Sequence, residues 1–251
     1  MRRYIYFVFL LCCAVNLLLT SCVRQKYVVM DMVHHNPGEA MTESKFLDPS
    51  FLKKNEYGAK VFFLFEAAQF GIDWKSFDPS LFPDTTEAGR WVAEKAEIIH
   101  KKYDAAKKED LQVYCMLDML VLPSLLVEKH RTELTNEQGK LDISKPYTQL
   151  CIRELMKEMF ETFPQLDGLV IRTGETYLHD APYYVGNHPV QNGMYDHITL
   201  INLLREEVCE RRNKKLFYRT WDMGQLHSIP KYYLSVTDSI EPVSYTHLTL
   251  P

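Results

Sequence analysis

Apolar residues occur along this chain in two kinds of segment that follow one another in turn. Short runs rich in β-branched and aromatic residues are too brief for helices and predict buried strands. Between them lie longer segments in which apolar residues recur at helical spacing. The predicted strands are Tyr27–Val33, Lys60–Phe65, Leu111–Leu117, Leu166–Ile171 and Lys215–Trp221.

The longer segments have the start and stop signals of helices. Thr86 is suited to cap a helix over Glu87–Lys108. Pro164 ends a second helix within Ser144–Phe163, and Tyr195–Arg212 forms a third. Strands separated by helical segments of about twenty residues predict βαβ units, and hence a parallel sheet joined by right-handed crossovers.

Two parallel architectures compete for this pattern. A doubly wound nucleotide-binding sheet places a glycine-rich loop directly after its first strand, but here only Gly38 is nearby and G-x-G-x-x-G is absent. A barrel instead places polar side chains at the carboxyl ends of several strands. We therefore predict an α/β fold, a parallel (β/α) barrel of TIM type that is incomplete, with about five of its strands present. The strand-end residues are Asp31, His34, His35, Glu66, Asp118, Arg172, Glu175, Trp221 and Asp222.

Composition excludes some classes of function. The chain has 251 residues, of which 46% are hydrophobic and 25% charged, as in ordinary globular proteins. Its formal charge of -4 and its lack of a long basic run give no electrostatic footprint for nucleic acid. A nucleic-acid partner is therefore not expected.

The cysteines indicate neither a metal site nor a disulfide framework. Half of the six lie within the first 22 residues, and the remaining ones are Cys115, Cys151 and Cys209. Each of these lies in an apolar-periodic segment, without a C-x-x-C motif and without a histidine at i+3 or i+4. We predict buried, unpaired thiols, and the sequence suggests no metal and no cofactor.

The N-terminus has the pattern of an export signal. Arg2 and Arg3 precede the apolar stretch Tyr4–Leu19, and Leu19–Cys22 resembles a bacterial lipobox. The alternative is a transmembrane anchor, but about 16 apolar residues are few for a ~30 Å hydrocarbon core. We predict a signal peptide over residues 1–21, a lipidated Cys22 with a short linker over 22–26, and a bacterial membrane-anchored lipoprotein on the periplasmic or cell-surface face.

The other end of the chain resembles something other than a protein motif. Residues Val243–Pro251 are similar to the translation of a sequencing-library adapter. We expect native sequence to end near Pro242, so that residues 27–242 form a partial barrel domain and 243–251 a non-native tail. The alternative is a genuine β-prone C-terminus.

The segment Leu166–Glu175 carries a family resemblance. Its apolar run ends in Arg172, Gly174 and Glu175, and here the chain resembles retaining and inverting glycoside hydrolases built on (β/α)8 barrels, whose acid/base carboxylate commonly ends strand four. Glu175 matches that position. The usual Asn-Glu or Asp-Glu pair is replaced by Gly174-Glu175, which leaves the specific family open. The resemblance covers residues 27–242 as architecture and only this strand end as a motif.

The resemblance implies a carbohydrate substrate and hydrolysis by two carboxyl groups, one protonated and one ionised. Glu175 is the candidate acid, and Asp118 or Asp222 the candidate partner. Arg172 has two interpretations. It either binds a substrate carboxylate, as in a uronic acid, or forms an ion pair with Glu175 or Asp118.

Histidine and aromatic side chains complete the candidate site. His34, His35, Tyr183, Tyr184 and Trp221 are candidates for sugar binding, against the alternatives of loop hydrogen bonding, loop cover and barrel packing. A second class of function is a membrane-anchored glycan-binding lipoprotein without catalysis. A third possibility is that the fragment is inactive, because an unclosed barrel exposes a sheet edge. A carboxylate at the end of a later strand would favour catalysis.

Overall fold

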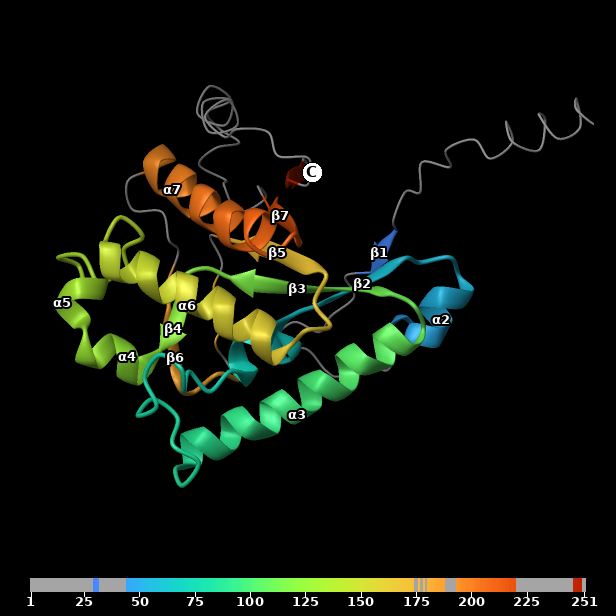
Figure 1. Ribbon diagram of the computed structural model, residues 1–251, viewed down its shortest axis with the longest axis horizontal. Helices are drawn as coiled ribbons and strands as arrows, with labels where there is room; N and C mark the ends of the chain where they lie inside the picture. Colours follow the sequence, from blue (N-terminus) through green and yellow to red (C-terminus); the bar gives the residue numbers. More distant parts are fainter. Residues whose placement is uncertain are drawn as a thin grey trace, which may run out of the picture.

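A parallel sheet alternating with helices forms the centre of the computed structural model (Figure 1). The structure describes residues 29–31, 44–173, 176, 178, 180–187 and 193–219, and the backbone of 246–249. The strands of this sheet lie in the order β1-β2-β3-β5-β7-β8. They are β1 (Met30–Asp31), β2 (Ala59–Phe62), β3 (Gln112–Asp118), β5 (Gly168–Arg172), β7 (Lys215–Arg219) and β8 (Thr246–Thr249).

The strand order confirms the predicted α/β class. Every neighbouring pair in this sheet is parallel. The strands of this sheet follow one another in the same order in space as in the chain, so the order never reverses. A doubly wound sheet reverses its order at a switch point, whereas consecutive (β/α) units of a barrel do not.

The predicted long helices are present close to their expected bounds. Helix α3 spans Glu87–Lys108, and the Thr86 side chain accepts a hydrogen bond from the Gly89 backbone at 3.0 Å. Helix α6 spans Pro146–Thr162, and α7 spans Met194–Leu204 before a π-helical turn, η4 (Arg205–Glu210). Short helices are η1 (Lys45–Leu47), α2 (Pro49–Lys54), η2 (Leu64–Glu66), η3 (Ala68–Gly71), α4 (Ser124–Lys129) and α5 (Arg131–Leu134).

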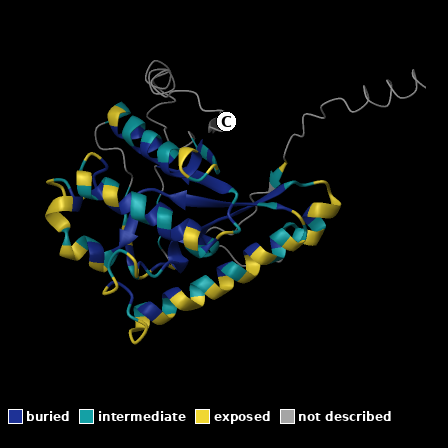
Figure 2. Ribbon diagram, in the orientation of Figure 1, coloured by how far each residue is buried: buried dark blue, intermediate teal, exposed yellow. Residues whose placement is uncertain are grey.

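The long helices cover one face of the sheet. Strand side chains alternate between two apolar clusters, and α3, α6 and α7 contribute only to the first. The central strands β2, β3 and β5 are almost wholly buried, while α3 exposes its outer side (Figure 2). A barrel places its helices on the outside in the same way, and the opposite face becomes its interior. That interior face carries Ala59, Val61, Phe63, Tyr114, Met116 and Val170.

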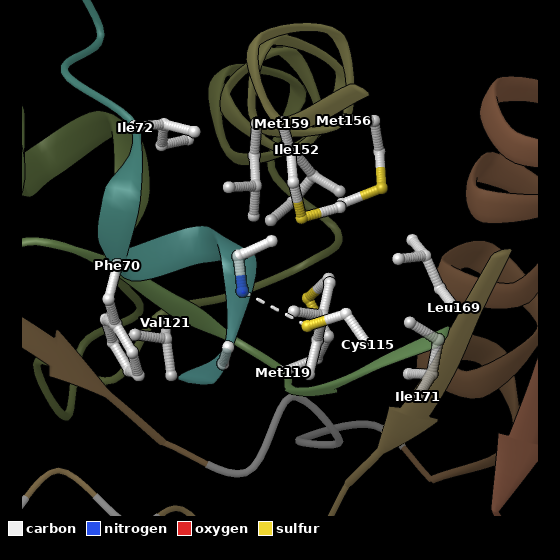
Figure 3. Close-up of a cluster of buried hydrophobic side chains, with 14 of the residues drawn as sticks. Phe70, Ile72, Cys115, Met119, Val121, Ile152, Met156, Met159, Leu169 and Ile171 are labelled. Carbon is white, nitrogen blue, oxygen red and sulfur yellow. Dashed lines mark hydrogen bonds between the residues drawn. The ribbon is translucent and has the colours of Figure 1, made fainter. Parts of the chain in front are cut away.

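The cysteine side chains of the described residues lie in the helix-facing cluster. Cys115 on β3 accepts a hydrogen bond from the Ala68 backbone at 3.2 Å, beneath Met156 and Met159 of α6 (Figure 3). Cys115, Cys151 and Cys209 are buried, as predicted, and none of them forms a disulfide bond with another described cysteine. Burial raises the pKa of both the Cys115 and the Cys151 thiols to about 12.

An antiparallel ribbon that the sequence did not predict joins two loops beyond the sheet. Strands β4 (Val121–Pro123) and β6 (Tyr184–Gly186) pair with each other. Next to them, Asn187 accepts a hydrogen bond from the Leu141 amide at 2.7 Å and donates one to its carbonyl at 3.1 Å. The segments that follow β3 and β5 are therefore tied together.

The second predicted strand is shorter than expected. It ends at Phe62, and Leu64, with a φ of 54°, starts the 3-10 helix η2. This turn directs Glu66 toward α3, where its carboxylate pairs with Lys102 and its carbonyl accepts from Tyr103 at 2.9 Å. Glu66 thus serves the helix layer and does not join the polar side chains at the strand ends.

The structure describes part of the C-terminal tail but none of the predicted N-terminal signal and anchor. The signal peptide, Cys22 and the linker lie outside the residues that the structure describes. At the other end, β8 lies within the segment expected to be non-native and pairs with β7. Within the described parts of the chain, no helix combines the length and the apolar character that crossing a membrane requires.

Candidate functional site

Asp118 and Arg172 form the centre of the candidate site. They end the neighbouring strands β3 and β5 and lie directly opposite each other in register. Arg172 Nε donates to Asp118 Oδ1 at 2.5 Å, and Nη2 donates to Oδ2 at 2.7 Å. The two side chains are only 4% and 5% exposed, so this is a buried, two-bonded ion pair.

A third strand end contributes an aromatic ring to this pair. Phe63 follows β2, and its ring centroid lies 4.4 Å from the central carbon of the Arg172 guanidinium. A guanidinium over the face of an aromatic ring is stabilised by the ring quadrupole. The orientation of Arg172 is thus fixed from two directions, along one edge by Asp118 and over one face by Phe63.

This geometry bears on both interpretations of Arg172. The ion pair with Asp118 is present, and it occupies the edge formed by Nε and Nη2. That edge is not open to a substrate carboxylate. Asp118 in turn accepts a hydrogen bond with each of its two carboxylate oxygens.

The two tyrosines proposed for sugar binding have different environments. Tyr184 is 5% exposed and packs against Phe70 and Phe82, with ring centroids 5.0 Å and 5.6 Å away. Its ring has no open face for a sugar, so Tyr184 belongs to the core. Tyr183 is partly exposed and meets the Trp91 ring edge-on at 5.7 Å. Tyr183 remains a candidate for stacking.

The other predicted site residues cannot be placed. Glu175, His34, His35, Trp221 and Asp222 all lie outside the residues that the structure describes. Within those residues, no group of three or more histidine, cysteine, aspartate or glutamate side chains is arranged to hold a metal ion.

Sequence reasoning missed Arg219, the last residue of β7. Its side chain is partly exposed, and Nη1 approaches Met116 Sδ at 3.7 Å. Met116 belongs to the interior face, so Arg219 lies on the same face. The alternation of Lys215, Phe217 and Arg219 places these three residues on one face of the strand. The predicted strand continued to Trp221, so Arg219 was not recognised as a strand-end residue.

The described residues also enclose a polar hollow of about 600 Å³ on the helix layer. Helix residues alone line it, and Arg153 crosses it to pair with Glu206 at 2.8 Å and Glu207 at 2.6 Å. No strand end contributes to this hollow, so it is separate from the Asp118–Arg172 site.

Comparisons with known proteins give distant structural matches only. No family model matches the chain, and no curated protein matches it in sequence. A noncanonic maltogenic α-amylase from Thermotoga neapolitana aligns with a TM-score of 0.42 and 13% identity, over 79% of this chain and 44% of its own. A GH138 enzyme targeting pectin rhamnogalacturonan II aligns with a TM-score of 0.41 and 15% identity, over 76% of this chain and 20% of its own.

A third match is a GH5_18 enzyme from Streptomyces cattleya in complex with Manβ1-4GlcNAc. It aligns with a TM-score of 0.35 and 14% identity, over 68% of this chain and 38% of that chain. The chain thus spans less than half the length of each of these proteins. Similarity at this level indicates neither a substrate nor a catalytic residue.

Proposed function

We propose that this protein acts on oligo- or polysaccharides as a glycoside hydrolase that uses carboxyl groups for general acid/base catalysis. The observation that carries the proposal is the buried Asp118–Arg172 pair at adjacent carboxyl ends of a parallel sheet. In parallel α/β folds, ligands bind at this edge, while the interior of each strand serves packing. Arg172 is also only three residues before Glu175 in the sequence.

Each candidate residue has a stated role in this proposal. Glu175 donates a proton to the leaving oxygen, and Asp222 is the candidate for the ionised partner. Asp118 acts through Arg172, which it holds at the strand end. Tyr183 offers an aromatic face for a sugar, and the remaining sugar contacts are assigned to His34, His35 and Trp221.

The second candidate function is a membrane-anchored protein that binds glycans without cleaving them. One observation favours it. Both oxygens of Asp118 accept hydrogen bonds from Arg172, which favours a positioning role for Asp118 over that of the second catalytic carboxylate. The two candidates share Cys22 as the proposed lipid attachment site, and hence a location on the bacterial membrane.

Hydrolysis assays on the protein encoded by the intact locus test the proposal. The purified protein is incubated with a panel of plant, algal and bacterial glycans, and new reducing ends are quantified. Release of oligosaccharides supports the hydrolase. Binding to a glycan on an array, with no new reducing ends from that same glycan, supports the binding protein instead.

A further inference from the structure

Arg219 lies at the carboxyl end of β7 and has no role in the proposed hydrolysis. Leu216 and Tyr218 of β7 pack in the helix-facing cluster, whereas Phe217 packs against the interior-face cluster. By the same alternation, Arg219 projects from the interior face at the carboxyl end of its strand. It reaches Met116 on β3, which lies two places away in the sheet, so its side chain extends across β5.

The charge of Arg219 is not balanced in the way that the charge of Arg172 is. Arg172 is neutralised by Asp118 at the end of the adjacent strand. No carboxylate of the residues that the structure describes forms a salt bridge with Arg219, whose only polar contact there is the Met116 thioether. A thioether is a weak acceptor and carries no charge.

The surroundings of Arg219 increase the effect of this unbalanced charge. Met116, Val170 and Phe217 form the apolar surface beside it. A partly exposed charge beside apolar surface is screened less by water than one in bulk solvent, which strengthens its attraction for an opposite charge. Among the residues that the structure describes, Arg219 is therefore a partly exposed guanidinium of this face that no carboxylate neutralises.

We propose that Arg219 binds the carboxylate of a uronic acid residue in the substrate. This inference rests on the proposed function, since it assigns a substrate class to the same strand-end site. The guanidinium fork matches two carboxylate oxygens, and the Nε–Nη2 edge of Arg172 is already occupied by Asp118. In this proposal, Arg219 takes the acidic-sugar role that the sequence suggested for Arg172.

Calorimetric titration of the protein from the intact locus tests this assignment. The probes are trimers of galacturonate, glucuronate and mannuronate, the same trimers after reduction of their carboxyl groups, and a sulfated galactose trimer. At least one uronate trimer should bind, and Arg219→Gln should weaken that binding by about ten- to a hundred-fold, the usual range for a hydrogen bond to a charged group. Binding of the reduced trimer should be the same in both proteins.

A matched control lies on the same strand. Lys215 belongs to the same face of β7 at its opposite end and donates to Gln112 at 3.2 Å. Lys215→Gln removes the same charge from the protein and should leave uronate binding unchanged. Should Arg219→Gln fail to fold, Arg219→Lys decides. It keeps the charge but loses the fork, and it should bind the uronate trimer more weakly than the parent and the reduced trimer equally well.

Several results would overturn the assignment. These are equal losses for acidic and reduced trimers in Arg219→Gln, a parent protein that prefers the sulfated trimer, or no binding of any uronate. The same experiments test the proposed hydrolase activity independently of the Arg219 assignment. Arg219-dependent uronate binding without cleavage supports the inference and contradicts the hydrolase. Cleavage of a uronate-containing glycan at the parent rate by Arg219→Gln contradicts the inference and supports the hydrolase.

Discussion

Arg172 bonds both oxygens of Asp118 through two different nitrogens, at 2.5 Å and 2.7 Å, across the last register position of β3 and β5. The two strands are thus joined by a side-chain ion pair at the last residue pair of their backbone ladder. Because both side chains are almost completely buried, removal of either charge would leave the other without its partner in apolar surroundings.

The pair predicts a specific pattern of stability. Asp118→Leu or Arg172→Met alone should lower the free energy of unfolding by about 3–5 kcal/mol, since each leaves one buried charge without its partner. The double variant should regain most of this loss. Urea unfolding of the four proteins measures the coupling. Glu97→Gln, which breaks the exposed pair of Glu97 with Lys101, is the control and should unfold like the parent. Additive losses in the double variant would contradict the coupling.

Glu175→Gln should separate binding from turnover in the protein from the intact locus. Glutamine keeps the shape and hydrogen bonding but has no transferable proton, so turnover should fall by ~10²–10⁴-fold while glycan binding survives. An aryl glycoside with a good leaving group needs little protonation and should suffer less.

Glu161 provides the control for this variant. It is exposed on α6, and Glu161→Gln should keep the parent rate. Equal rates for Glu175→Gln and its parent on both substrates would make Glu175 a structural residue. Loss of glycan binding together with activity would instead indicate that Glu175 holds Arg172 in place.

Lipidation at Cys22 is tested in cells. Metabolic labelling with a palmitate analogue should mark the protein, and Cys22→Ser should abolish the label because the acylated thiol is gone. Cys13→Ser, a change within the predicted signal peptide, should leave labelling intact. Continued labelling of Cys22→Ser would contradict the lipobox interpretation.

The raised pKa values of the buried thiols predict slow alkylation. With a pKa of about 12, each of the Cys115 and Cys151 thiols is about one part in 10⁴ thiolate at pH 8. Iodoacetamide should label the two corresponding peptides slowly in the native protein and rapidly in guanidinium chloride, as quantified by mass spectrometry. Rapid native labelling of either peptide would show that its thiol is accessible.

The same shifts predict how stability depends on pH. The folded-state pKa of each thiol is raised above the ordinary value of 9.0, so folding favours the protonated form. Their contribution to stability is complete below pH 9 and is lost as the pH rises toward 12. Cys115→Ala with Cys151→Ala should reduce this alkaline loss, measured as the change in urea midpoint between pH 8 and pH 10.5 relative to the parent.

Local patterns were sufficient to predict most of the sheet and the long helices. Helix α3 was expected at Glu87–Lys108 and has those bounds, because Thr86 provides a strong N-terminal signal and basic side chains end the last turn. The buried face of α6 is harder to predict than its bounds. Leu150 of α6 is apolar and yet 41% exposed, because the buried stripe of the helix runs through Cys151, Ile152 and Leu155.

The candidate site was predictable only in part. Asp118 and Arg172 each end an apolar run, and an ion pair between them was one of the two interpretations. The β4–β6 ribbon was not predicted, since its strands are three residues each and lie some sixty residues apart in the chain. That ribbon also explains Tyr184, which starts β6 and is drawn into the core beside Phe70, whereas Tyr183 stays at the surface.

The hydrogen bonds of Asn187 to Leu141 have a consequence for engineering. Asn187 also exchanges backbone hydrogen bonds with Leu120, so one residue connects segments that follow two different strands. A loop transplanted into this scaffold from another protein would need to bring both segments, residues 119–143 and 181–187, as a single unit. Exchanging either one alone would leave the polar backbone of the other without its partner, and a combinatorial library built on this rim should vary the two together.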